Sequence, residues 1–244
     1  FVSRSDTEVV LHAFAEWGVD SVSRFIGMFA FVLLDRKTRQ IRIVRDRAGI
    51  KPLFCYWKDD LFLFSSELKA FHQHTRFSKE LNVHAVHQFM DYGYVPSPDC
   101  IFKDCFKLSA GHILTIDLAS KTLTRSKYWD VMEFYDRPCL DISYPDAMEE
   151  VERLLTSACE YRMVADVPVG VFLSGGYDST AVVALLQTAR SRRLKTFTLG
   201  FEGGNDETPY ARTIARHFGT DHSEYFCTSK EAQEIVPRLP ESFD

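Results

Sequence analysis

The segment with the most specific chemistry is a short polar loop between an apolar strand and a helix. It reads Ser174-Gly175-Gly176-Tyr177-Asp178-Ser179. Two adjacent glycines let the backbone approach a ligand and turn its N–H groups towards it, and the N-terminus of the following helix adds partial positive charge. Hydroxyl groups on both sides of the glycines can donate further hydrogen bonds. The pattern therefore predicts a phosphate-binding loop.

Asp178 is unexpected in such a loop, because bare phosphate would repel its carboxylate. A divalent cation between the two groups would remove the repulsion, and Mg²⁺ commonly binds one or two carboxylates together with nucleotide phosphates. We therefore predict that Asp178 binds Mg²⁺. The simpler interpretation is a glycine turn in which Asp178 or Ser179 only caps the helix, since both residue types are favoured there. The position of the loop after the first strand of a βαβ pattern favours the phosphate site.

Other nucleotide-binding loops fit this segment less well. It lacks the lysine of G-x-x-x-x-G-K-[ST], so transfer of a γ-phosphoryl group is not indicated. It also lacks G-x-G-x-x-G, although Glu202 could supply the acidic residue that a dinucleotide site needs after the second strand. A dehydrogenase is therefore a distant alternative.

The elements around the loop alternate between strand and helix. We expect strands at residues 167–173, 196–201 and 222–226, and helices at residues 179–190 and 208–218. This βαβαβ order predicts a parallel sheet covered by helices on both faces, with ligands at the carboxyl ends of the strands.

The first half of the chain is rich in short strands. Helices are expected there at residues 5–17 and 82–91, hairpins at residues 28–44 and 113–128, and two further short strands at residues 53–57 and 61–64. A helix at residues 145–162 is expected after this strand-rich part. Residues 130–144 hold no clear period and contain Pro138. We therefore predict an α+β domain at residues 1–130 and an α/β domain at residues 131–244.

Composition narrows the class of protein. The 244 residues are 45% hydrophobic and 26% charged, as in ordinary globular proteins, and the net charge of -5 comes without a basic block that would bind nucleic acid. No apolar run reaches membrane-spanning length, and the six cysteines form no C-x-x-C pair. We expect a cytoplasmic protein with reduced thiols and with no nucleic-acid or membrane partner. Both ends fall within patterned segments, so we interpret the chain as an internal part of a longer protein.

The loop and the strand before it resemble the pyrophosphate loop of the N-type ATP pyrophosphatases, which adenylylate a substrate and release pyrophosphate. Within that group, residues 167–171 and 197–201 resemble asparagine synthetase B. The resemblance implies a doubly wound parallel-sheet ATP pyrophosphatase domain, present in part, that uses ATP, Mg²⁺ and aspartate. It implies an ATP site formed by Leu173, Ser174, Gly175, Gly176, Asp178, Ser179 and Leu199. Leu173 and Leu199 would lie against adenine, although both also suit a buried core.

The first half resembles, also in part, the N-terminal-nucleophile-type glutaminase domain of the same enzymes. The resemblance is carried in order by residues 5–9, 27–31, 45–53 and 65–70. It implies that Asp6 holds the α-amino group of glutamine. Ser5 and Glu8 also form an S-x-x-E capping box, in which Asp6 would be a favourable first-turn acid.

Two further expectations concern residues without a catalytic role. Arginine and aspartate clustered after a strand, as at residues 45–47, are typical of a structural ion network. The family nucleophile is a cysteine at the mature N-terminus, whose amino group acts as base, and the synthetase lysine lies further downstream. We therefore assign no catalytic residue to this chain and expect the chain alone to be inactive.

The hypothesis from sequence is a glutamine-hydrolysing asparagine synthetase. ATP would activate aspartate as an acyl adenylate, and ammonia from glutamine would displace AMP. One alternative is an amide ligase of the same scaffold acting on a sugar acid, closing a lactam or cyclising a peptide. A second alternative is a nucleotide-binding relative without synthetic activity. The partners are then small molecules, and a homodimer is one option.

Overall fold

The computed structural model describes residues 1–3, 5–202 and 206–243. The chain divides into two compact units, Phe1–Pro138 and Cys139–Phe243. Each unit has hydrophobic clusters of its own. The domain limits at residues 130 and 131 stay a prediction.

The first unit contains two antiparallel sheets. The larger has the order β1-β2-β6-β7, and the smaller has the order β4-β3-β5. Their strands are β1 (Ala30–Asp35), β2 (Gln40–Arg45), β3 (Phe54–Lys58), β4 (Leu61–Ser65), β5 (Cys105–Lys107), β6 (His112–Asp117) and β7 (Thr122–Lys127). The two expected hairpins are confirmed by the pairing of β1 with β2 and of β6 with β7, and the two further expected strands pair with each other as β3 and β4. The short strand β5 was not expected.

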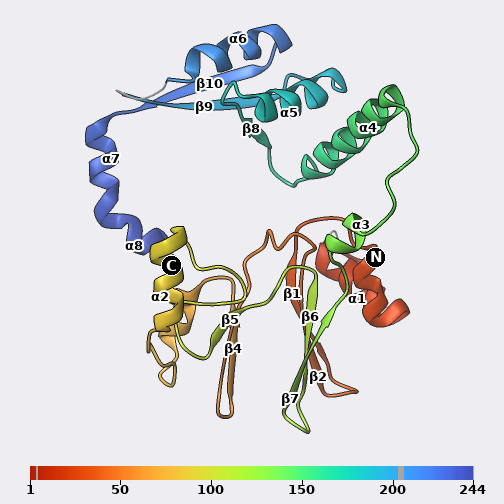
Figure 1. Cartoon of the computed structure of the whole chain (residues 1–244), viewed down its shortest axis with the longest axis vertical. Coiled ribbons are helices and arrows are strands. Elements are labelled where there is room, and N and C mark those ends of the chain that lie inside the picture. Colours follow the sequence, from red (N-terminus) through yellow and green to blue (C-terminus); the bar gives the residue numbers. More distant parts are fainter. Residues whose placement is uncertain (4, 203–205, 244) are drawn as a thin grey trace. The chain divides into compact units, whose positions relative to one another are not determined.

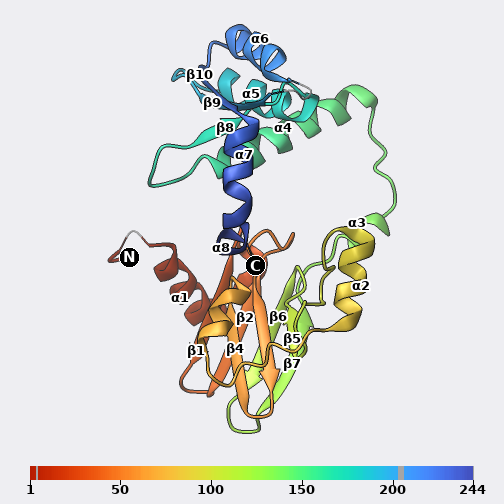
Figure 2. The ribbon, with the colours of Figure 1, turned by 90° about the vertical axis from the view of Figure 1, so that its left-hand side faces the viewer.

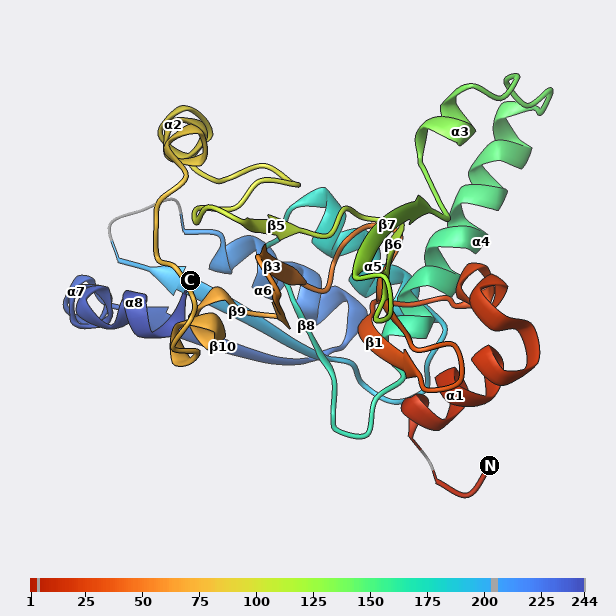
Figure 3. The ribbon, with the colours of Figure 1, turned by 90° about the horizontal axis from the view of Figure 1, so that it is seen from below.

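The two sheets of this unit enclose one core and carry helices outside. Ile43 and Leu114 of the larger sheet share a buried cluster with Cys55 of the smaller one. Phe14 of α1 (Asp6–Trp17) packs against Val44, on the other face of the larger sheet, and η1 (Gly18–Arg24) follows α1. The short helix η2 (Leu68–Gln73) packs against the smaller sheet. The helix α2 (Val83–Tyr92) follows η2 in the chain (Figure 1 and Figure 3).

The second unit has the expected alternation of strands and helices. Its elements are α4 (Tyr144–Arg162), β8 (Gly170–Phe172), α5 (Tyr177–Thr188), β9 (Lys195–Phe201), α6 (Thr208–Phe218) and β10 (Asp221–Cys227). The strands are parallel in the order β10-β9-β8, which confirms the βαβαβ prediction. The helices α7 (Ser229–Ile235), η3 (Val236–Arg238) and α8 (Leu239–Ser242) follow β10 (Figure 2). The short α3 (Met132–Tyr135) precedes the unit.

Helices cover one face of this parallel sheet, not both as we expected. Along β9, Thr196, Thr198 and Gly200 are buried and the residues between them are exposed. Side chains from α4, α5 and α6 join a single cluster with Leu173 on the buried face. Leu199, on the other face, is 47% exposed. Within the described residues, this second face has no covering layer, so the prediction of a doubly covered sheet is wrong for this chain.

Across residues 1–3, 5–202 and 206–243, no helix is both long and apolar enough to cross a membrane.

Candidate functional site

The predicted phosphate loop lies at the carboxyl end of β8 and runs directly into α5. The helix begins at Tyr177, two residues earlier than expected, so Gly176 is its N-cap. Gly176 has no side chain to cap the helix, and no other side chain replaces it. Asp178 and Ser179 lie inside the first turn, which disfavours the interpretation that either is simply the N-cap. The first N–H groups of α5 are therefore available to an anion.

The hydroxyl groups of the loop brace its backbone. The Oγ atoms of Ser174 and Ser179 lie 2.9 Å apart. Ser179 Oγ also accepts the N–H of Ser174 at 3.2 Å and donates to the carbonyl of Gly176 at 3.3 Å. Ser174 Oγ accepts the N–H of Gly176 at 3.3 Å. These bonds fix the shape of the loop, and direct donation from either serine to phosphate stays a prediction.

The two glycines serve the loop in different ways. Gly175 has φ +85°, and a Cβ there would lie 2.7 Å from Cβ of Tyr210 and 2.9 Å from the nitrogen of Ala211. Both contacts belong to the first turn of α6, so Gly175 lets the loop pack directly on that helix. A Cβ on Gly176 would meet only Ser174 Oγ, at 3.4 Å. The space beside Gly176 is thus open to a ligand.

Asp178 is the free carboxylate of the site. Its side chain is exposed and makes no hydrogen bond or ion pair with any described residue. A lone carboxylate beside an uncapped helix N-terminus suits a divalent cation that also binds phosphate. The exposed carboxylate therefore fits the predicted Mg²⁺, and Asp178 as its ligand stays a prediction.

Leu173 directly follows β8 and Leu199 lies on the neighbouring strand β9, but their side chains face opposite ways. Leu173 is 1% exposed and belongs to the core below the sheet. Its N–H donates to Phe197 O at 2.8 Å, and its carbonyl accepts the hydroxyl of Thr198 at 2.5 Å. Leu199 faces the open side of the sheet. The contact of either residue with adenine stays a prediction, and Leu173 has a core role in any case.

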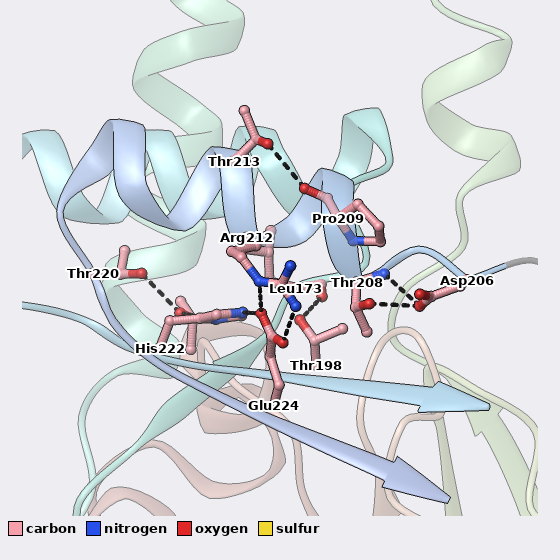
Figure 4. Close-up of polar contacts among 11 residues, drawn as sticks. Leu173, Thr198, Asp206, Thr208, Pro209, Arg212, Thr213, Thr220, His222 and Glu224 are labelled. Atoms are coloured by element: carbon pink, nitrogen blue, oxygen red, sulfur yellow. Dashed lines mark hydrogen bonds and ion pairs between the residues drawn. The ribbon is translucent and has the colours of Figure 1, made fainter. Parts of the chain in front are cut away.

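A polar group lies between α6 and the sheet, next to the loop (Figure 4). Arg212 of α6 donates two hydrogen bonds to Glu224 of β10, at 2.9 and 2.6 Å, and this pairing lowers the pKa of Glu224. At the start of α6, Asp206 Oδ1 accepts the hydroxyl of Thr208 at 2.6 Å and its N–H at 3.0 Å. These two bonds lower the pKa of Asp206. The pair of Arg212 and Glu224 links α6 to β10 and so supports the helix on which Gly175 packs.

Asp6 lies in a pocket of the first unit. The pocket has a volume of about 630 Å³. Its walls come from all four stretches that resemble the glutaminase domain: Asp6 and Thr7, residues 28–31, Lys51 with Pro52, and Ser66. The sequence predicted a role for Asp6 but none for Lys51 or Ser66. The order of the four stretches along the chain was the available signal, but only the fold brings them around one cavity.

The capping box predicted at the start of α1 is wrong, because neither of its two reciprocal bonds forms between Ser5 and Glu8. Ser5 is the N-cap, and its side chain accepts the N–H of Thr7. The Glu8 carboxylate does not return to Ser5; it accepts the N–H groups of Val2 and Ser3, at 2.7 and 2.6 Å, and the hydroxyl of Ser3 at 2.6 Å. These bonds lower the pKa of Glu8 to about 2. Asp6 keeps an exposed carboxylate at the pocket.

The charged residues at positions 45–47 are structural, as expected, but they do not form an ion network. Within the described residues, none of the three makes an ion pair. Arg45 donates to the carbonyls of Lys51, Leu108 and Gly49. Burial lowers the pKa of Arg45, and the nearby Asp46 carboxylate opposes that shift. The sequence could not reveal that their partners are backbone groups.

Comparison with known proteins assigns both units to families. Residues 1–129 match the glutamine amidotransferase domain family, and residues 150–244 match the asparagine synthase family. A Methanocaldococcus jannaschii protein named as a glutamine-hydrolysing asparagine synthetase is 37% identical over 98% of this chain and 46% of its own length. Through residues 1–129, the chain belongs to the glutamine amidotransferase domain family.

Two further relatives show how the similarity extends. Asparagine synthetase [glutamine-hydrolyzing] 3 of Bacillus subtilis is 30% identical over 99% of this chain and 41% of its own length. A Gibberella zeae protein named amidase chry2 is 31% identical over 91% of this chain and 34% of its own length. The chain thus spans less than half the length of these relatives.

Proposed function

We propose that the full-length protein converts aspartate to asparagine, with ATP as the source of energy and glutamine as the source of nitrogen. The observation that carries this proposal is the pairing of two sites in one chain: the Asp6 pocket in a glutamine amidotransferase unit and an uncapped phosphate loop in an asparagine synthase unit. The first unit supplies ammonia, and the second consumes it.

The proposed work of the first unit is recognition of an amino acid. Asp6 presents an exposed carboxylate in a pocket of about 630 Å³, a size that suits a small ligand. Its negative charge pairs with the α-ammonium group of glutamine and distinguishes an amino acid from a simple amide. The proposed role of Asp6 is to bind glutamine, and we assign it no part in cleaving the amide.

The proposed work of the second unit is binding ATP and stabilising the departing pyrophosphate. We expect the N–H groups at the start of α5 and the helix dipole to stabilise the negative charge that grows as the bond between the α- and β-phosphates breaks. Asp178 holds Mg²⁺, which when bound supplies positive charge to the phosphates. The braces from Ser174 and Ser179 keep the loop in shape without reorganisation during the reaction.

The test is product analysis with the full-length protein. Aspartate, glutamine and ATP with Mg²⁺ should yield asparagine, glutamate, AMP and pyrophosphate in equal amounts. ADP as the product would contradict adenylylation. Asp178→Ala should abolish the Mg²⁺-dependent activity, and full activity in that variant would contradict the metal assignment. Size-exclusion chromatography with light scattering would test the proposed homodimer.

A second candidate keeps the mechanism and changes the acceptor. The amidase relative is as similar to this chain as the asparagine synthetase of Bacillus subtilis is. Sequence identity over this chain therefore does not by itself show that aspartate is the acceptor. AMP formation that depends on glutamine but requires a different carboxylate would favour this candidate. Aspartate saturating the reaction in the millimolar range or below would exclude it.

A further inference from the structure

The carboxylate of Asp46 is buried and lies within a ring of backbone N–H groups. The residue is 1% exposed. Oδ1 accepts the N–H groups of Ala48 and Ile50, at 3.2 and 2.9 Å, and Oδ2 accepts those of Lys51 and Phe29, at 2.9 and 3.3 Å. No described cation forms an ion pair with it. Four converging N–H groups therefore compensate the cost of burying this charge.

The donors to Oδ2 come from two different walls of the Asp6 pocket. Phe29 precedes β1, and Lys51 follows the turn after β2. Both residues line the pocket, together with Asp6. A single oxygen atom thus fixes the spacing between two segments that are 22 residues apart in the sequence. The backbone strengthens this link, because the N–H of Asp46 donates to Phe29 O at 2.9 Å.

Arg45 stabilises the same turn by donating hydrogen bonds to the backbone carbonyl groups of the turn. Its guanidinium donates to Gly49 O at 2.7 Å and to Lys51 O at 2.9 Å. Gly49 has φ +66°, and a Cβ there would lie 3.2 Å from Cζ of Arg45. In the turn from Ala48 to Lys51, backbone N–H groups therefore donate to Asp46, and backbone carbonyl groups accept hydrogen bonds from Arg45. The backbone of this turn therefore has more side-chain hydrogen bonds than an exposed turn needs to keep its shape.

We propose that Asp46 is a positioning residue for the glutamine site. Its carboxylate sets the distance between the Phe29 wall and the Lys51 wall, and so shapes the space in which Asp6 meets the substrate. The inference rests on the proposed glutaminase function of the first unit. Asp46 itself does not line the pocket, and it acts through the backbone of the residues that do.

The test compares Asp46→Asn with Asp117→Asn in the full-length protein. Asparagine keeps the size of the side chain but turns an NH₂ group towards one pair of N–H donors. Two of the four N–H groups then lose their acceptor, and the spacing that the carboxylate sets between the two walls changes. Asp117 is the matched control: its Oδ1 accepts the N–H groups of Ala119 and Ser120, at 2.9 and 2.8 Å, in an exposed turn away from the pocket. Glutamate release measures the first unit, and asparagine formation from ammonium chloride measures the second.

Asp46→Asn should raise KM for glutamine by about tenfold or more, the scale of effect expected when a binding wall shifts by a fraction of an ångström. Its rate with ammonium chloride should stay unchanged, and Asp117→Asn should leave both activities unchanged. A purely structural role would lower the amount of active enzyme and leave KM at the wild-type value. A wild-type KM in folded Asp46→Asn would therefore overturn the positioning role alone. Absence of glutamate release by the wild-type protein would overturn the glutaminase proposal and this inference with it.

Hydrogen exchange of the wild-type protein gives an answer even if Asp46→Asn fails to fold. The N–H groups of Phe29 and Lys51 should exchange slowly, and saturating glutamine should slow both by the same factor. Exchange of these two groups as fast as that of Ala119 and Ser120 would contradict the proposal. So would protection by glutamine at one wall only.

Discussion

The loop before α5 and the turn after β2 use the same materials in opposite ways. Both follow a strand, and both gather backbone N–H groups around one point. In the turn, the chain supplies its own anion, because the buried Asp46 carboxylate accepts four N–H groups. In the loop, Asp178 is exposed and the start of α5 has no side-chain cap. The comparison teaches that N–H groups form a ligand site only where the chain leaves them without an internal acceptor.

The largest expected effect separates the two aspartates by stability. Asp46→Ala leaves four buried N–H groups without acceptors and should lower the free energy of unfolding of the first unit by about 4 kcal/mol. Asp178→Ala removes an exposed side chain and should change the stability of its unit by less than about 0.5 kcal/mol. Urea unfolding of residues 1–244, followed by tryptophan fluorescence, reports on the first unit, since the three tryptophans of this sequence, Trp17, Trp57 and Trp129, lie in it. An equal loss of unfolding free energy in Asp46→Ala and Asp178→Ala would contradict the different roles assigned to the two carboxylates.

The next effect separates the two glycines within the loop. Gly175→Ala forces a side chain into φ +85° and against Tyr210 and Ala211, and should cost about 3 kcal/mol. Gly176→Ala meets only Ser174 Oγ at 3.4 Å and should cost about 1 kcal/mol or less. Denaturation followed by far-UV circular dichroism measures both. A larger loss of stability in Gly176→Ala than in Gly175→Ala would contradict the assignment of the open space to Gly176.

The sequence predicted those features of the second unit that depend on local pattern. The limits of α6 at residues 208 and 218 agree with the structure, because Pro209 and Gly219 mark its ends. The parallel order of three strands followed from their alternation with helices. The loop was placed correctly between strand and helix, although Gly176 rather than a polar residue is the cap.

Features that depend on tertiary contacts could not be predicted. Nothing in the sequence says that Phe29 and Lys51 share one oxygen of Asp46, because the fold alone brings them together. The capping box failed for a similar reason, since the carboxylate of Glu8 is taken by the N–H groups of Val2 and Ser3. Buried strand positions also gave Leu173 and Leu199 the same expected environment. The direction of each side chain relative to the helix layer then separated them.

A smaller effect tests whether the loop is held by its own hydroxyl groups. Ser179→Ala removes the acceptor of the Ser174 N–H and the donor to the Gly176 carbonyl, and should cost about 1–2 kcal/mol. Ser191→Ala, at an exposed position of the same unit, is the control and should change stability by less than about 0.5 kcal/mol. If both variants unfold at the same urea concentration, the hydroxyl bonds do not stabilise the loop.

The smallest effect concerns Glu8, whose carboxylate gathers backbone N–H groups as Asp46 does but lies nearer the surface. Its pKa is lowered from 4.5 to about 2, first by the hydroxyl of Ser3 and then by the N–H groups of Val2 and Ser3. Since the pKa in the folded state is the lower one, the stabilisation is complete above pH 4.5 and is lost as the pH falls towards 2. Glu8→Gln should therefore be less stable than the wild type at pH 7 and equal to it near pH 2. Glu16→Gln, on the exposed part of the same helix, should show no such convergence. A stability difference for Glu8→Gln that stays constant across this range would show that its charge does not hold the N-terminal segment.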